Sequence, residues 1–141
     1  MCDGRWRMVV MLAVVCCAGC WGGGPDDMPD IAPVTGTLTL DGQPLGMAHI
    51  IFTPIDGGQT SEAYSDPTGQ YALVYKRDIM GAKIGKHKVV VTTFEEPEST
   101  DDGKTIGGVP ERVPAKYNAN TTLQFDVNSG ENVIDLQLTS K

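Results

Sequence analysis

The residues that could do acid–base or metal chemistry are few, and the two histidines come first. His49 and His87 each lie within a short run of residues that we predict to be a β-strand. Side chains alternate along a strand, so we expect His49 to face outward with Ile51 and His87 to share the inward side of Val89. Two histidines without a nearby acidic spacing pattern do not make a zinc site. We therefore predict no metal and no cofactor, with one ring nitrogen of His87 hydrogen-bonded locally.

Serine chemistry is the second candidate. A serine nucleophile needs a base within reach and an acid that orients that base. The sequence has no Gly-x-Ser-x-Gly motif, and its serines lie in turn-like or terminal contexts: Ser61, Ser65, Ser99, Ser129 and Ser140. We predict no catalytic residue and a protein that is not an enzyme.

The third candidate is an acidic segment, Glu95-Glu96-Pro97-Glu98 followed by Asp101-Asp102. Carboxylate oxygens are ligands that calcium accepts, as in weak extracellular sites. The EF-hand spacing is absent, however, and Pro97 restricts how the segment could wrap around an ion. Like charges also repel one another and keep such a loop extended. A solvated acidic loop is the favoured interpretation.

Cys20 is the residue whose surroundings point most clearly to a specific chemistry. It follows the apolar run Met8–Ala18, which is too short to span a membrane but suits the core of an export signal. The sequence Cys17-Ala18-Gly19-Cys20 resembles a lipobox, with Cys17 where an aliphatic residue is usual. We predict a lipoprotein signal peptide over residues 1–19 and lipid attachment, with acyl chains such as palmitate, at Cys20. An ordinary cleaved secretory signal is the alternative.

Cysteine placement and charge limit the partners of the remaining chain. The four cysteines lie at or before position 20, so the exported part has no disulfide and no cysteine-based metal site. The chain has 11 lysines and arginines against 18 acidic residues, a formal net charge of −7. Such an acidic surface disfavours nucleic acids and anionic lipid heads. Membrane residence is therefore expected to depend on Cys20. A single acyl chain binds membranes only marginally, but the resemblance to a lipobox implies a cysteine that carries two or three chains.

Beyond Cys20 the sequence reads as a tether followed by one β-rich domain. Residues 20–33 are rich in glycine and proline and are predicted to be a flexible tether. From Val34 onward short apolar runs alternate with turn residues, and no window has helical periodicity. The predicted strands are Val34–Leu40, Ala48–Thr53, Thr60–Ser65, Tyr71–Tyr75, Lys86–Phe94, Leu123–Val127 and Val133–Leu138. In the first of them, alternation places Val34, Leu38 and Leu40 on one face and Thr35, Thr37 and Thr39 on the other. About seven short strands at this spacing predict an antiparallel, Greek-key β-sandwich over residues 34–141.

Turn chemistry separates these strands. Asp41-Gly42 is a strong hairpin signal, because glycine takes positive φ easily. Asp66-Pro67-Thr68-Gly69 fits a type I turn, in which the Asp66 carboxylate accepts bonds from amides of its own turn. Tyr71 begins the next strand, and its ring is predicted to face inward. Residues 95–116 are the exception, a long polar segment without apolar periodicity. A loop of that length is either functional or disordered. Phe94 and Tyr117 flank it and could form a small apolar patch for a partner, but packing at the hinge of the loop is the favoured interpretation.

Three segments, in order, resemble the hallmarks of carboxypeptidase regulatory-like domains. They are residues 36–50, with Gly42-Gln43-Pro44-Leu45 at their centre; Ser65-Asp66-Pro67-Thr68-Gly69-Gln70-Tyr71; and residues 84–91. The resemblance covers roughly residues 34–92, and the remaining tail is similar to small planctomycete lipoproteins of this group. It implies a transthyretin-like β-sandwich with about seven strands and no single activity, since function is carried by sites and not by folds.

Taken together, these features predict a non-catalytic, lipid-anchored module of the cell envelope with a structural or protein-interaction role. The expected location is the outer membrane or cell surface, with an envelope protein or glycan as possible partner. The alternative is an extracytoplasmic ligand-binding module for carbohydrate or peptide, on an exposed sheet face or on the segment 95–116. Trp21 lies in the tether, which weakens the carbohydrate version of that alternative. The sequence identifies no ligand-binding residue.

Overall fold

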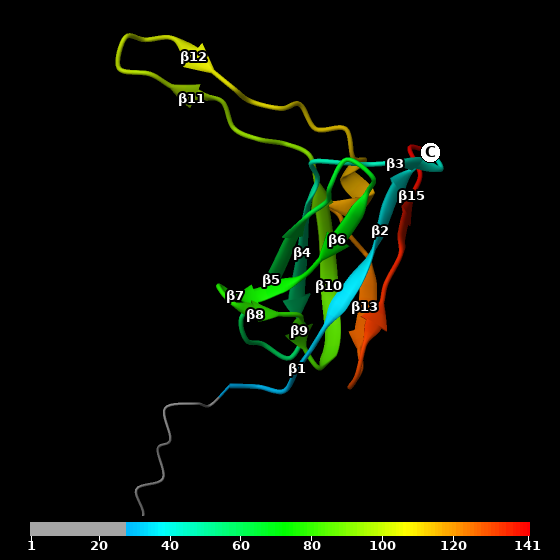
Figure 1. The fold of residues 1–141 in the computed structure, drawn as a ribbon. Coiled ribbons are helices and arrows are strands. Elements are labelled where there is room, and N and C mark those ends of the chain that lie inside the picture. The colour runs from blue at the N-terminus through cyan, green and yellow to red at the C-terminus, as the bar shows by residue number, and fades with distance from the viewer. Residues whose placement is uncertain (1–27) are drawn as a thin grey trace, which may run out of the picture.

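The computed structural model describes residues 28–141, which form a β-sandwich (Figure 1). The larger sheet has the strand order β13-β10-β4-β5-β7-β8. Its strands, in chain order, are β4 (His49–Pro54), β5 (Ser61–Tyr64), β7 (Val74–Lys76), β8 (Ile79–Met80), β10 (Gly85–Thr92) and β13 (Gln124–Val127). Within it, β10 pairs with β4 and β13 in antiparallel register.

The smaller sheet is centred on β2 (Val34–Leu40). One long side of β2 pairs with β14 (Asn132–Val133) and β15 (Leu136–Leu138), and the other with β3 (Gln43–Pro44) and β6 (Gln70–Ala72). Because β6 belongs to this sheet and β7 to the larger one, the chain crosses between the sheets at Leu73. The all-β sandwich predicted from the sequence is confirmed.

The pairing between the first and last long strands corrects the prediction of a wholly antiparallel fold. Strands β14 and β15 run parallel to β2. Between β2 and β14 the chain passes through all the strands of the larger sheet, so the last strands reach β2 by a crossover between the sheets and not by a hairpin. A hairpin would force antiparallel pairing, whereas a crossover permits the parallel pairing seen here.

The core lies between the sheets and follows the alternation of the strands. Val34 and Leu38 are buried on the inner face of β2, while Thr35 and Thr37 are exposed on the outer face. The largest fully buried side chains include Phe52, Leu38, Ile50, Leu73, Leu136 and Leu138. Burial of this apolar surface is the main force that holds the two sheets together.

Several predicted boundaries differ from the structure. Ile31–Ala32, placed in the tether by the sequence analysis, form β1 and pair with β9 (Ala82–Lys83), and Ala32 is 2% exposed. The predicted strand Tyr71–Tyr75 divides at Leu73, where the chain changes sheets, and the last predicted strand divides between Val133 and Leu136. Strands of two or three residues have too few positions to show an alternating pattern.

The long polar segment is not an irregular loop. Residues 95–109 form an extended hairpin, here called the arm, which contains β11 (Glu98–Ser99) and β12 (Thr105–Ile106). At the base of the arm, Glu95 and Val109 exchange both backbone hydrogen bonds at 3.1 Å. A 3-10 helix, η1 (Ala115–Tyr117), follows. Figure 1 shows the arm projecting from the end of the sandwich where β10 ends, with β1 at the other end.

Candidate functional site

A groove of about 610 Å³ lies on the outer face of the smaller sheet. Its floor consists of two rows of side chains set by strand register. Thr35 lies between Ala72 and Val133 in the first row. Thr37 lies opposite Gln70 in the second row, and its other neighbour is Asp135. The exposed threonines of β2 that the sequence placed opposite its apolar face therefore form a polar floor.

Asp66 borders this groove from the turn before β6. Its Oδ1 accepts hydrogen bonds from the Thr68 amide at 2.8 Å, the Thr68 hydroxyl at 2.6 Å and the Gln70 amide at 3.0 Å. The Gly69 amide bonds to the Asp66 carbonyl at 2.8 Å, and Gly69 has φ 81°. The predicted turn chemistry is confirmed. The Thr68 hydroxyl, with the Gln70 and Thr68 amides, holds the pKa of Asp66 below its usual value despite some desolvation.

Asp135 borders the groove from the opposite side. Its Oδ1 accepts the Thr37 amide at 3.0 Å and the Thr37 hydroxyl at 2.9 Å, which fixes the carboxylate against β2. Tyr71 lies beneath, 4% exposed, and donates its hydroxyl to the Ile134 carbonyl. The inward orientation predicted for Tyr71 is confirmed. Burial, and then the charge of Asp135, raise the pKa of the Tyr71 phenol far above its usual range.

A stacked aromatic pair stands beside the groove. The rings of His49 and Tyr64 are 4.6 Å apart and nearly parallel, with an angle of 6° between their planes. His49 Nε2 lies 2.9 Å from a carboxylate oxygen of Glu62. Tyr64 is 62% exposed and lines the groove. The outward position predicted for His49 is confirmed, but the sequence analysis did not single out Tyr64, whose partner lies on a neighbouring strand.

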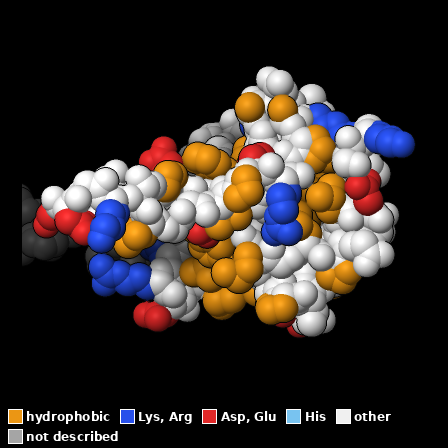
Figure 2. Space-filling view, turned by 90° about the horizontal axis from the view of Figure 1, so that it is seen from above, with side chains coloured by type: hydrophobic (Ala, Val, Ile, Leu, Met, Phe, Trp, Pro, Cys, Tyr) orange, Lys and Arg blue, Asp and Glu red, His pale blue; other side chains and the backbone are white. Residues whose placement is uncertain are grey.

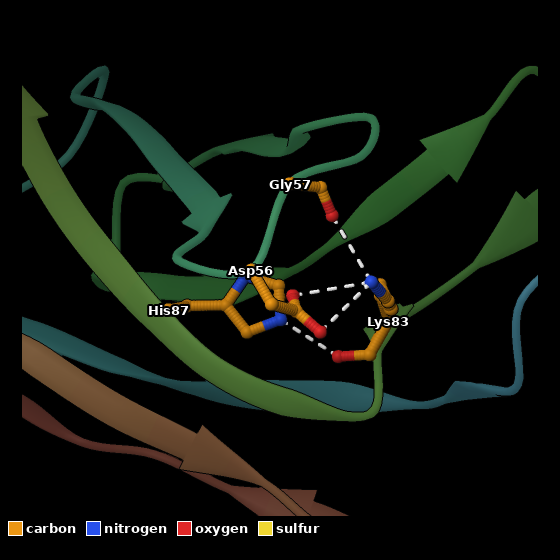
Figure 3. A network of polar contacts seen from close by, with 4 residues as sticks. All are labelled: Asp56, Gly57, Lys83 and His87. Atoms are coloured by element: carbon orange, nitrogen blue, oxygen red, sulfur yellow. Dashed lines mark hydrogen bonds and ion pairs between the residues drawn. The ribbon is translucent and has the colours of Figure 1, made fainter.

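His87 occupies the opposite environment, inside the sandwich near the start of β10 (Figure 3). It is fully buried, and its Nε2 lies 2.7 Å from the Lys83 carbonyl. Its Nδ1 has no hydrogen-bond partner among residues 28–141. Lys83 itself bonds through Nζ to Asp56 and to the Gly57 carbonyl. The inward position and local hydrogen bond predicted for His87 are confirmed. The side chain has no exposed surface on which it could contact a ligand.

Glu111 fastens the base of the arm, a role that the sequence analysis missed. Its Oε1 accepts the Thr93 amide at 2.9 Å, the Thr93 hydroxyl at 3.0 Å and the Val113 amide at 2.9 Å. Its Oε2 accepts the Thr92 hydroxyl. Partial burial opposes ionisation, yet these hydrogen bonds together hold the pKa of Glu111 below its usual value. This carboxylate, here called the clamp, ties the two ends of the arm together.

The arm and its surroundings are mostly exposed. The carboxylates of residues 95–102 lie along it, and Lys104 pairs with Asp102 at 3.3 Å. Figure 2, seen from above, shows the arm reaching away from the sandwich and hydrophobic side chains gathered at its base. Phe94 is 52% exposed there, so the hinge packing predicted for it is wrong. Tyr117 packs against the core and bonds through its hydroxyl to the Thr139 amide.

No three acidic, histidine or cysteine side chains among residues 28–141 are grouped so that they could hold a metal ion. No helix of the same part is long and apolar enough to cross a membrane. Cys20, the predicted lipid attachment residue, lies outside the described residues, as does the predicted signal peptide.

Comparisons with known proteins add little. No family model matches the chain, and no curated protein matches it. Among solved structures, a DUF3823 family protein from Parabacteroides merdae is similar over 78% of this chain, with 9% sequence identity and a TM-score of 0.41. The chain spans 46% of the length of that protein. The resemblance to carboxypeptidase regulatory-like domains therefore stays a prediction.

Proposed function

We propose that this protein is a non-catalytic, lipid-anchored module of the cell envelope that acts through protein interactions. In this proposal Cys20 carries the lipid, and the sandwich holds the arm and the groove at a distance from the membrane. The outer membrane or cell surface is the location that this role favours.

The observation that carries the proposal is the separation between the two ends of the sandwich. The chain reaches the sandwich through β1, beside β9 and the start of β10, where the Ile84 amide bonds to the Asp30 carbonyl at 2.9 Å. The arm leaves from the other end of β10. Eight residues of antiparallel strand span about 25 Å. An anchor at Cys20 would therefore hold one end of the sandwich and leave the arm at the end that faces away.

The titratable groups of the sandwich support a non-catalytic role. The Asp66 and Glu111 carboxylates each accept several hydrogen bonds that brace a turn or the arm. His87 is enclosed by the core, and burial raises the pKa of Tyr71, which keeps that phenol protonated at neutral pH. Each of these side chains has a structural task that accounts for its position.

The experiment that tests the proposal compares the full-length protein with Cys20→Ala in intact-mass measurement and membrane fractionation. We expect the wild type to begin at an acylated Cys20 and to partition with membranes, and Cys20→Ala to remain unprocessed or mislocalised. A wild type that is soluble and cleaved at another residue would remove the anchor from the proposal. The ligand-binding alternative would then become the leading function.

A further inference from the structure

The groove on the smaller sheet has a charge that limits what it can bind. Of the residues within 28–141 that line it, two are charged, and both are acidic: Asp66 and Asp135. The hydrogen bonds to Asp66 keep its pKa low, so this carboxylate is ionised at neutral pH. Two carboxylates without a lysine or arginine among the lining residues attract cations and repel anions.

Each of these carboxylates is oriented by one oxygen and leaves the other available. Thr37 holds Oδ1 of Asp135, and the turn amides hold Oδ1 of Asp66. The hydrogen bonds that Asp135 and Asp66 form within the part of the chain that the structure describes all end on Oδ1, which leaves both Oδ2 atoms without a partner there. A carboxylate already fixed in place loses little conformational freedom when it accepts a further bond, which favours binding.

Tyr64 adds a flat apolar surface beside these acids. His49 covers one face of its ring from the neighbouring strand, where the two residues are register partners. The ring is still 62% exposed and lines the groove. A planar guanidinium group stacks on an aromatic ring and also forms paired hydrogen bonds with carboxylates, which a lysine ammonium does less well.

We infer that this groove binds an arginine side chain presented by an extended segment of a partner protein. Resting on the proposed function, this inference names the chemistry of the partner that the interaction module would recognise. The guanidinium lies against the Tyr64 ring and bonds to Oδ2 of Asp135 or Asp66. Thr35, Thr37 and Gln70 on the floor offer hydroxyl and amide groups to the backbone of the bound segment. The groove is open and its floor includes two rows of residues of the sheet, which gives room for an extended chain.

The test uses the full-length protein in detergent micelles and a fluorescently labelled probe peptide, acetyl-Gly-Arg-Gly-Arg-Gly-amide. Binding is followed by fluorescence anisotropy at low ionic strength, because salt screens exposed charges. The matched probe replaces both arginines by citrulline, which has nearly the same shape and no charge. We expect the arginine peptide to bind at least about tenfold more tightly than the citrulline peptide, because hydrogen bonds between charged groups are stronger than those of a neutral group.

Variants then locate the site. Asp135→Asn keeps an oxygen for the Thr37 bonds but removes the charge, and we expect about tenfold weaker binding. Tyr64→Leu removes the ring, with an expected loss of about threefold to tenfold. Asp126→Asn is the control, because Asp126 is an exposed carboxylate on β13 that does not line the groove. This variant should bind the arginine peptide with the affinity of the wild type. Unfolding curves check that each variant remains folded.

Three outcomes would overturn the inference. Equal affinity for the arginine and citrulline peptides would show that the charge is not recognised. An equal loss in Asp135→Asn and Asp126→Asn would show general attraction to an acidic protein. Binding of a neutral glucan that depends on Tyr64 but not on Asp135 would make the groove a glycan site. Because anisotropy is independent of acylation, arginine binding by an unacylated protein would retain this inference while removing the anchor.

Discussion

In the sandwich, Leu38, Ile50 and Phe52 have no exposed surface, whereas every residue from Phe94 to Ser99 at the start of the arm is exposed. The sandwich is therefore stabilised by burial. The arm depends on the backbone bonds of its own hairpin and on the Glu111 clamp at its base. A two-stranded hairpin alone is marginally stable in water. The comparison separates a body held together by burial from an extension held by hydrogen bonds alone.

The largest effect should come from emptying the core. Phe52→Ala removes a fully buried ring and leaves a cavity, which costs about 3–5 kcal/mol in the free energy of unfolding. Phe94→Ala makes the same chemical change at a side chain that is 52% exposed, and its effect should stay within about 0.5 kcal/mol. Urea unfolding followed by circular dichroism measures both. Similar losses would contradict the division between buried sandwich and exposed arm.

The clamp should have a smaller and more local effect. Glu111→Gln removes the charge that Thr92, Thr93 and Val113 bind, and its cost is about 1–3 kcal/mol. Hydrogen exchange should quicken at the Thr93 and Val113 amides, while amides in the centre of β4 are little changed.

The control for the clamp is Glu98→Gln, an exposed carboxylate on β11. Neither its unfolding curve nor its exchange at Thr93 should differ from the wild type. Faster exchange throughout β4 in Glu111→Gln would instead mean that the clamp supports the sandwich as a whole.

Acid should weaken the clamp through the same carboxylate. The folded pKa of Glu111 is depressed below its usual value of 4.5, so its contribution is present above that value and is lost as pH falls through the folded pKa. Asp66 and Asp41 are depressed in the same direction, by bonds from Thr68 and from Ser140. Unfolding free energy should fall below about pH 4.5, and less steeply in Glu111→Gln. Parallel curves for the two proteins would exclude Glu111 as a contributor.

Asp66 and Glu111 also show which parts of this molecule the sequence could predict. Both are carboxylates that collect backbone amides. The donors to Asp66 lie within four residues of it, so turn chemistry predicted them. The donors to Glu111 include Thr93, 18 residues away, and the intervening arm has no periodic pattern. The clamp follows from tertiary pairing, which local spacing does not encode.

The same distinction holds for the strands and the groove. Alternation placed Thr35 and Thr37 on the outer face of β2, which became the floor of the groove. It could not bring Asp135 against Thr37, because 98 residues separate them and their strands pair in parallel. The fold was therefore accessible from local patterns, whereas the groove required knowledge of which strands are neighbours.

Removing the arm altogether should affect stability less than breaking the clamp does. Replacing residues 96–108 by Asn-Gly would join Glu95 to Val109, which already exchange two backbone bonds and suit a two-residue hairpin. The deleted residues contribute no side chain to the core, and a shorter loop costs less closure entropy. The free energy of unfolding should stay within about 1 kcal/mol of the wild type, on the stabilised side. Urea unfolding of this variant beside Glu111→Gln tests the comparison directly. If the truncated protein lost as much stability as the clamp variant, the arm would be part of the cooperative fold, because only shared packing could transmit the loss.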